Sequence, residues 1–119
     1  MTIIGIEHIQ LAMAPGGEPA ARAFYTGMLE LPERTKPPGL AAHGGCWFEG
    51  PGVKMHLGVE ADFRPALKAH PALLVDNLAG LVEMLEDCGF PIVADDPVDG
   101  RARCYVSDPF GNRIELIQA

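Results

Sequence analysis

The sequence predicts an α+β protein made of two βαβββ modules, because one pattern of residues occurs twice along the chain. His8 opens the first copy in IEHIQLAMA, and His70 opens the second in KAHPALLVD, each ahead of a helix-like segment. Each copy closes on a hairpin, GPGVKMHLGV or DPFGNRIELI, in which His56 and Glu115 hold equivalent places. Strands with helices on one face leave the other face free. We therefore expect curved mixed sheets around a cleft, with the helices on the outer face.

Length and composition place both copies in one compact unit. The chain has 119 residues, of which 48% are hydrophobic and 21% are charged, an ordinary globular composition. We expect a single domain over residues 1–119, with module one at about 1–60, a linker at about 61–69 and module two at about 70–119. The net charge of −7 argues against a nucleic-acid-binding protein, which would need a basic face.

The cellular location is predicted from three further features. No segment approaches the roughly 18 consecutive apolar residues of a membrane span. The opening MTIIGIEH has no basic region, long apolar core or cleavage site of a secretion signal. Three cysteines without a CxxC pair are typical of reduced thiols. We therefore expect a cytoplasmic protein that binds neither membranes nor nucleic acids.

The first copy is expected to begin with a strand at residues 3–13, where side chains alternate between apolar and other types. A helix should run from about Glu18 to about Leu31, because its apolar residues recur at helical spacing. Residues 33–44 are rich in Pro and Gly and predict one short strand or a loop over the site, a candidate lid. Strands at about 45–49 and 53–60 should form a hairpin.

The second copy repeats this order. We expect a strand at 70–75 and a helix at 78–88 that ends at Gly89. Three strands follow, near 91–95, 102–107 and 112–118, and the last two are joined by the turn DPFGN.

Strand parity divides the candidate residues into two sets. Alternate apolar residues should pack under the helices, namely Ile9, Leu11, Met55, Leu57, Val59, Leu73, Val75, Ile114 and Leu116. The opposite parity carries His8, His56, His70 and Glu115, so all four should lie on the face that the helices leave free. Gln10 and Trp47 have the parity for the cleft wall, although Gln10 is equally explained as a surface residue and Trp47 as a core aromatic.

Four residues of metal-ligand type at equivalent positions predict a metal site. A single strand histidine more often serves as an ordinary hydrogen-bonded residue. Glu115 lies between Ile114 and Leu116, and burying a carboxylate there is costly unless a cation or strong donors satisfy it. His43 lies in the flexible segment AAHGG and is expected to be solvated or part of a lid. The three cysteines, Cys46, Cys88 and Cys104, are spaced unlike a metal knuckle and are expected to be buried thiols.

Four motifs together resemble the vicinal oxygen chelate superfamily, which includes glyoxalases, fosfomycin-resistance proteins, extradiol dioxygenases and bleomycin-resistance proteins. They are IEHIQLAM, ARAFYTGMLEL, AHPALLVDNLAGLVEMLEDCG and YVSDPFGNRIELIQ, which span nearly the whole chain. The resemblance implies a glyoxalase-like domain with His8, His70 and Glu115 as metal ligands. His56 stands where glyoxalases carry a glutamate ligand and fosfomycin-resistance proteins carry none, so the set has three or four members. Glu30 replaces the glycine that usually follows the first helix.

The resemblance also implies a chemistry. Two imidazoles and a carboxylate leave positions open on a divalent ion (Fe, Mn, Ni, Co or Zn) for a small substrate with two adjacent oxygens. The enzyme would then be a metal-dependent lyase or isomerase, or a dioxygenase, with Glu115 as a possible general base and Tyr105 as a substrate donor. The alternative is a metal-free protein that sequesters a drug or antibiotic, as bleomycin-resistance proteins do. Short members of the superfamily further imply a homodimer with sites shared between subunits.

Overall fold

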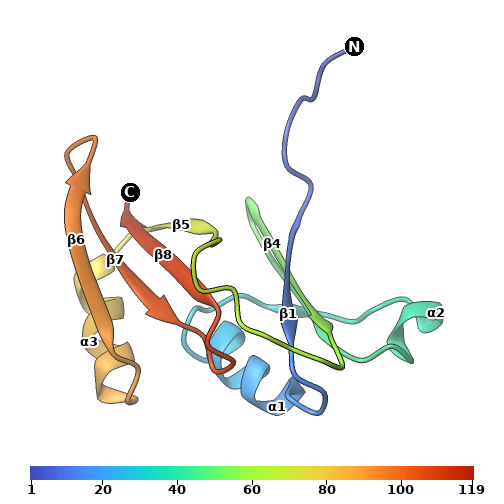
Figure 1. Cartoon of the computed structure of the whole chain (residues 1–119). Helices are drawn as coiled ribbons and strands as arrows, with labels where there is room; N and C mark the ends of the chain where they lie inside the picture. Colours follow the sequence, from blue (N-terminus) through green and yellow to red (C-terminus); the bar gives the residue numbers. More distant parts are fainter. The chain divides into compact units, whose positions relative to one another are not determined.

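The computed structural model describes residues 1–119 and divides the chain into two compact units, Met1–Arg64 and Pro65–Ala119. Each unit contains one four-stranded mixed sheet (Figure 1). The predicted α+β class with two βαβββ modules is thereby confirmed. No helix of the chain combines the length and the apolar character needed to cross a membrane.

The first unit follows the βαβββ order with one additional short helix. Its sheet has the strand order β1-β4-β3-β2, in which β1 runs parallel to β4 and the other neighbours are antiparallel. The elements are β1 (Ile9–Met13), α1 (Glu18–Ala21), the π-helical turn η1 (Arg22–Thr26), β2 (Glu33–Arg34), α2 (Pro38–Ala41), β3 (Cys46–Gly50) and β4 (Val53–Val59).

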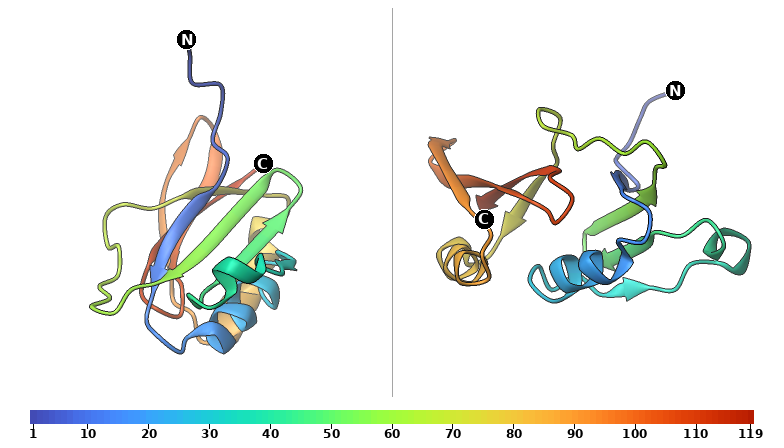
Figure 2. Two further views of the ribbon diagram at one scale, coloured as in Figure 1. Left: turned by 90° about the vertical axis from the view of Figure 1, so that its right-hand side faces the viewer. Right: turned by 60° about the horizontal axis from the view of Figure 1, so that its bottom comes forward.

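The second unit repeats the same topology. Its strand order is β5-β8-β7-β6, and β5 runs parallel to β8. The elements are β5 (Ala72–Val75), α3 (Leu78–Asp87), β6 (Ile92–Val98), β7 (Arg101–Ser107) and β8 (Arg113–Gln118). In each unit the main helical segment lies along one face of its own sheet (Figure 2).

The core of the first unit joins the helical segment to the sheet through aromatic rings. Tyr25 stacks on Phe48 of β3 at a centroid distance of 5.2 Å, and Phe24 meets Tyr25 edge-on at 5.0 Å. Such aromatic pairs add to the free energy gained from burial itself. The remaining buried apolar residues come from α1 and strands β1, β3 and β4, namely Leu11, Met13, Ala21, Cys46, Met55 and Leu57.

The core of the second unit lies between α3 and its sheet. Buried Leu78 and Leu85 of α3 face a sheet whose buried apolar residues are Cys104, Val106, Ile114 and Leu116. Asn77 caps the helix by accepting a hydrogen bond from the Gly80 amide, and the Leu78 amide donates to Gln118 of β8. These contacts tie the start of α3 to the strand that carries Glu115.

Several element boundaries differ from the sequence predictions. The strand expected at 3–13 begins at Ile9, and residues before it form an extended exposed segment with Ile3, Ile4 and Ile6 in solvent (Figure 1). The strand expected at 70–75 begins at Ala72. His8 and His70 therefore precede their strands instead of lying on a strand face. Pairing starts at Ile9 with Met55 and at Ala72 with Glu115, although β4 and β8 each begin two residues earlier, so the chain joins each sheet edge only after its histidine.

Other differences arise from turn geometry. The helix expected to reach Leu31 ends after η1, where the backbone widens so that Gly27 lies against the Ala23 carbonyl. Residues 33–44 contain the short strand β2 and also the short helix α2, which was not predicted. Strand β6 runs to Val98, beyond the predicted end near residue 95. Asp99 and Gly100, both at positive φ, form the two-residue turn into β7.

Candidate functional site

The strand register of the first unit aligns the predicted residues in one row across the sheet. Gln10 of β1 pairs with His56 of β4, His56 pairs with Trp47 of β3, and Trp47 pairs with Arg34 of β2. Paired residues share one face of a sheet. The register therefore places Gln10, His56 and Trp47 together, as the parity predicted.

The rings in this row form a continuous stack. His56 lies between His8 and Trp47, with centroid distances of 4.4 Å to each and interplanar angles of 19° and 8°. The Arg34 guanidinium lies over the Trp47 ring at 5.3 Å, in cation–π contact. We call His8, His56, Trp47 and Arg34 the stacked row.

His56 is buried and hydrogen-bonded at the edge of its ring. Its Nε2 lies 2.8 Å from Glu49 Oε2, and only 5% of the residue is exposed. Arg34 donates to the other Glu49 oxygen at 3.2 Å. The hydrogen bond from His56, together with that from Arg34, holds the pKa of Glu49 below its usual range against the effect of burial. Glu49 was not predicted as a site residue, although it shares its face of β3 with Trp47.

His8 and Gln10 lie at the more open end of the row. His8 Nδ1 lies 3.2 Å from Glu7 Oε1, and Lys54 donates to the other Glu7 oxygen. If Nδ1 carries the proton toward Glu7, His8 Nε2 has a free lone pair. The exposed Gln10 side chain lies over Gly58. A Cβ added at Gly58 would lie 2.5 Å from Nε2 of Gln10.

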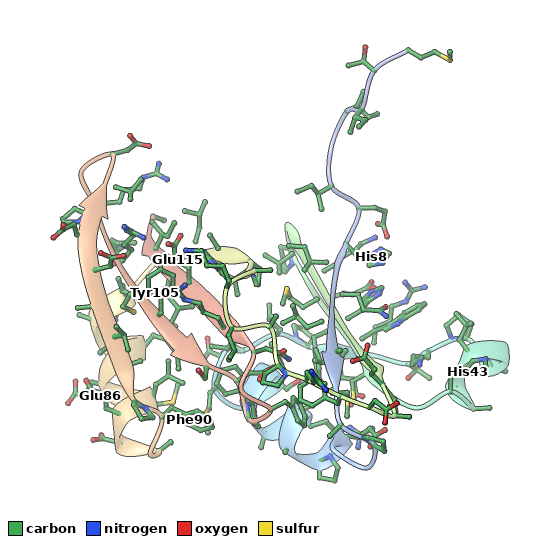
Figure 3. All side chains as sticks on the ribbon, viewed as in Figure 1. His8, His43, Glu86, Phe90, Tyr105 and Glu115 are labelled. Carbon is green, nitrogen blue, oxygen red and sulfur yellow. The ribbon has the colours of Figure 1, made fainter.

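The second unit holds an equivalent row built around Glu115. Glu115 of β8 pairs with Tyr105 of β7 on one side and with Ala72 of β5 on the other. Its exposed fraction is 8%, between the fully buried neighbours Ile114 and Leu116. Figure 3 shows Tyr105 and Glu115 close together on their neighbouring strands.

His70 directs one ring nitrogen toward this carboxylate. Its Nδ1 donates to the Lys68 carbonyl at 2.8 Å, which leaves the lone pair on Nε2. His70 Nε2 lies 3.9 Å from Glu115 Oε1, and the ring meets Tyr105 edge-on at 5.3 Å. An imidazole fixed through its other nitrogen is the usual arrangement of a metal-binding histidine. His70 and Glu115 therefore supply two donor groups of the types that divalent ions accept.

Arg103 is the main site residue that sequence reasoning missed. It shares its face of β7 with Tyr105, and its side chain donates to Glu115 Oε1 at 2.8 Å and to the Tyr105 hydroxyl at 2.7 Å. The same guanidinium lies 3.1 Å from Asp95 Oδ2. The alternation Arg-x-Arg-x-Tyr over residues 101–105 could have predicted this position, because it places Arg103 on the same strand face as Tyr105.

These donors keep Glu115 ionised. Burial works to raise the pKa of Glu115, but hydrogen bonds from Arg103 and Tyr105 and the charges of Arg103 and His70 outweigh it. The pKa of this carboxyl therefore lies below its usual range. The Arg113 guanidinium also lies over the Tyr105 ring, at 3.8 Å from its centroid.

The turn before β8 sets the position of Glu115. Asp108 Oδ1 accepts hydrogen bonds from the amides of Phe110 and Asn112, each at 2.9 Å. Asn112 then accepts from the Ala66 amide at 3.0 Å, which binds the preceding segment to the turn. Gly111 at a φ of 90° allows this turn to pass against Pro65. The DPFGN turn thus positions the start of the strand that carries Glu115.

The structure does not bring every candidate into the rows. Neither unit by itself gathers three His, Cys, Asp or Glu side chains into a group that could hold a metal ion. His43 is exposed beside α2 and lies apart from His8 (Figure 3). Cys46 and Cys104 are buried thiols as predicted, but Cys88 is exposed because it follows the last turn of α3. Val59, expected in the core, is 37% exposed at the end of β4.

Comparison with known proteins places the chain in a family. A glyoxalase family protein from Bacillus anthracis is 42% identical, with a TM-score of 0.93, over 99% of this chain and 97% of that one. The fosfomycin resistance protein FosX from Listeria monocytogenes is 16% identical with a TM-score of 0.79, over 99% and 95% of the two chains. The antibiotic binding protein TnmS3 from Streptomyces is 21% identical with a TM-score of 0.68, over 98% of each. No protein-family model and no curated protein sequence matches the chain.

The two distant structures show a shared fold, whereas the Bacillus anthracis protein shows a relationship in sequence across almost the full length. The duplicated modules and the YVSDPFGNRIELIQ motif agree with that relationship. The chain therefore belongs to the glyoxalase family, within the vicinal oxygen chelate superfamily.

Proposed function

We propose that this protein is a divalent-metal-dependent enzyme of the glyoxalase/dioxygenase type, which acts on a small substrate that chelates the metal through two adjacent oxygens. The observation that carries the proposal is the pair formed by His70 Nε2 and Glu115 Oε1, 3.9 Å apart, with His70 Nδ1 already held by the Lys68 carbonyl. His8 would be the third ligand. A bound Fe, Mn, Ni, Co or Zn ion would polarise the substrate oxygens and stabilise negative charge on them.

His56 is better suited to support His8 than to bind the metal. Two rings stacked at 4.4 Å and 19° keep their lone pairs in separate, nearly parallel planes, whereas an ion bound by both rings would have to lie in both planes. His56 Nε2 is also engaged by Glu49. We therefore propose the three-ligand set His8, His70 and Glu115, with His56 fixing the plane of the His8 ring.

The surrounding residues have distinct tasks in this proposal. Glu115 is ionised at neutral pH, which suits a ligand, and its lowered pKa makes it a weak general base. Tyr105 would present its hydroxyl to a substrate oxygen, since that group already exchanges hydrogen bonds with Arg103 and Glu115. Trp47 and the exposed Gln10 would line the substrate site. The reaction would be that of a lyase, an isomerase or a dioxygenase.

We further propose a homodimer in which the first module of one chain completes the site of the second module of its partner. Each unit alone supplies too few ligands for a metal site, and β1 and β5 are both edge strands of their sheets. Unpaired edges favour association with another strand. A two-fold dimer would cover them and would create two equivalent sites.

One observation favours the alternative, a metal-free protein that binds and sequesters a small molecule such as an antibiotic. The Arg103 guanidinium already neutralises Glu115, so the carboxylate is satisfied without a metal ion. TnmS3, which has the same fold, is an antibiotic binding protein. The two proposals differ in their need for metal.

Metal binding by protein purified without an affinity tag tests the main proposal. The wild type should bind about one divalent ion per chain, and His8→Ala, His70→Ala and Glu115→Ala should each weaken binding at least about ten-fold without loss of the fold. His43→Ala is the matched control, because His43 is exposed away from the rows. His56→Ala should have a smaller effect. Wild-type protein that takes up no Fe(II), Mn(II), Ni(II) or Zn(II) would instead support the binding protein.

A further inference from the structure

We propose that Arg103 is the counter-cation that Glu115 holds until a metal ion binds, and that Asp95 keeps the displaced guanidinium afterwards. This inference rests on the proposed metal site. Arg103 would then be a positioning residue that sets the affinity of the site for the ion.

The side chain of Arg103 is held at four points in the second unit. Its Nη1 donates to Glu115 Oε1 at 2.8 Å and to the Tyr105 hydroxyl at 2.7 Å, and its Nη2 lies 3.1 Å from Asp95 Oδ2. Its Nε donates to the Asp96 carbonyl at 2.7 Å. Only 15% of the side chain is exposed. The guanidinium thus bridges two carboxylates, one in the predicted metal site and one outside it.

The metal ion and Arg103 would compete for one oxygen atom. Glu115 Oε1 accepts the hydrogen bond from Arg103 and also faces His70 Nε2 at 3.9 Å. An ion bound by both His70 and this oxygen would lie a few ångströms from the guanidinium. Arginine does not lose its charge in proteins, so the two cations repel each other strongly at that distance. Binding of an ion by this oxygen would therefore favour a longer or broken Arg103–Glu115 hydrogen bond.

The other contacts give Arg103 a place to remain when that bond breaks. Asp95 faces it from β6, and the register of β6 and β7 is irregular between Asp95 and Val98, where the Asp96 carbonyl accepts from Arg103 Nε. Loss of the Glu115 contact alone leaves both β6 contacts in place. Asp95 has an exposed fraction of 42% in its side chain, so its carboxylate can turn toward the guanidinium without burial.

The test is the dissociation constant of Zn(II) and Mn(II) for the full-length protein and three variants. Arg103→Gln removes the competing charge and should tighten binding about ten-fold, and Arg103→Lys should give an intermediate value because lysine cannot bridge the same four acceptors. Asp95→Asn should weaken binding about three-fold, because the guanidinium then depends more on Glu115. Arg101→Gln is the matched control, since it removes the same charge from an exposed position on β7 and should leave binding unchanged.

Opposite effects of the Arg103→Gln and Asp95→Asn substitutions on metal affinity would show that Arg103 competes with the ion for Glu115 and does not support Glu115 as a ligand. If Arg103 merely orients Glu115 as a ligand, its removal should weaken metal binding about 10- to 100-fold, and that result overturns the inference. Thermal unfolding of the metal-free proteins gives a second readout, in which Arg103→Gln and Arg103→Lys should both lower the melting temperature. Wild-type protein that binds neither ion overturns the proposed metal-dependent function as well, whereas wild-type binding without tightening in Arg103→Gln overturns only the inference.

Discussion

At the scale of single residues, the two modules hold their opening histidines in the same way. His8 and His70 each engage an acceptor within two residues through Nδ1, which is the Glu7 carboxylate for His8 and the Lys68 carbonyl for His70. Each arrangement suits a ring that offers Nε2 to an external partner. The closing strands differ, because His56 is buried by rings on both faces whereas Glu115 is surrounded by hydrogen-bond donors.

The lowered pKa of Glu115 predicts a specific loss of stability in acid. A carboxyl group whose pKa is lower in the folded than in the unfolded protein stabilises the fold above its usual pKa, and this contribution is lost as pH falls through the folded value. Metal-free Glu115→Gln should therefore lose less free energy of unfolding than the wild type below about pH 4. Urea unfolding between neutral and acidic pH measures this slope. Glu83→Gln, at an exposed position, should follow the wild type; an unchanged slope in Glu115→Gln would contradict the prediction.

Burial predicts that one of the three thiols reacts in the native protein. Burial, with a further contribution from the charge of Glu33, raises the pKa of Cys46 to about 11, and burial also raises the pKa of Cys104. The reactive thiolate is therefore scarce at both buried positions, whereas Cys88 is exposed. Iodoacetamide at neutral pH should label Cys88 first, and peptide mass spectrometry identifies the site. Cys88→Ser is the control that should remove rapid labelling; rapid modification of Cys46 in the folded protein would be inconsistent with its burial.

At the scale of elements, the backbone is strained just after the first helical segment, at Glu30. Glu30 stands where the resemblance to the superfamily implies a glycine, and its φ is 58°, in the left-handed region. Glu30→Gly should raise the free energy of unfolding by about 0.5–1 kcal/mol, since the relief of strain exceeds the entropic cost of glycine. Chemical denaturation of both proteins measures the difference. Glu60→Gly, at an exposed position just after β4, should not stabilise the protein, and stabilisation there would point to a cause other than the φ of residue 30.

At the scale of the whole molecule, the predicted homodimer can be tested by subunit mixing. A His8→Ala chain and a Glu115→Ala chain should each fail to bind metal normally. If sites are shared between chains, each heterodimer should regain one intact site and carry one site with both substitutions. Metal content measured after exchange should rise to about half of the wild-type value per heterodimer. Mixed tags show that exchange has occurred, and exchange without recovered binding would place the ligands of one site in a single chain.

The sequence alone determined the duplicated βαβββ pattern and the positions of most strands. These follow from side-chain periodicity and turn residues, which act over short stretches of chain. The tertiary structure decided where strands begin, because β1 and β5 join the edges of β4 and β8 only at Ile9 and Ala72, after both histidines. It also decided that Arg103 reaches Glu115, since that contact depends on the register of β7 against β8. Register joins segments that are distant in sequence, so local patterns do not specify it.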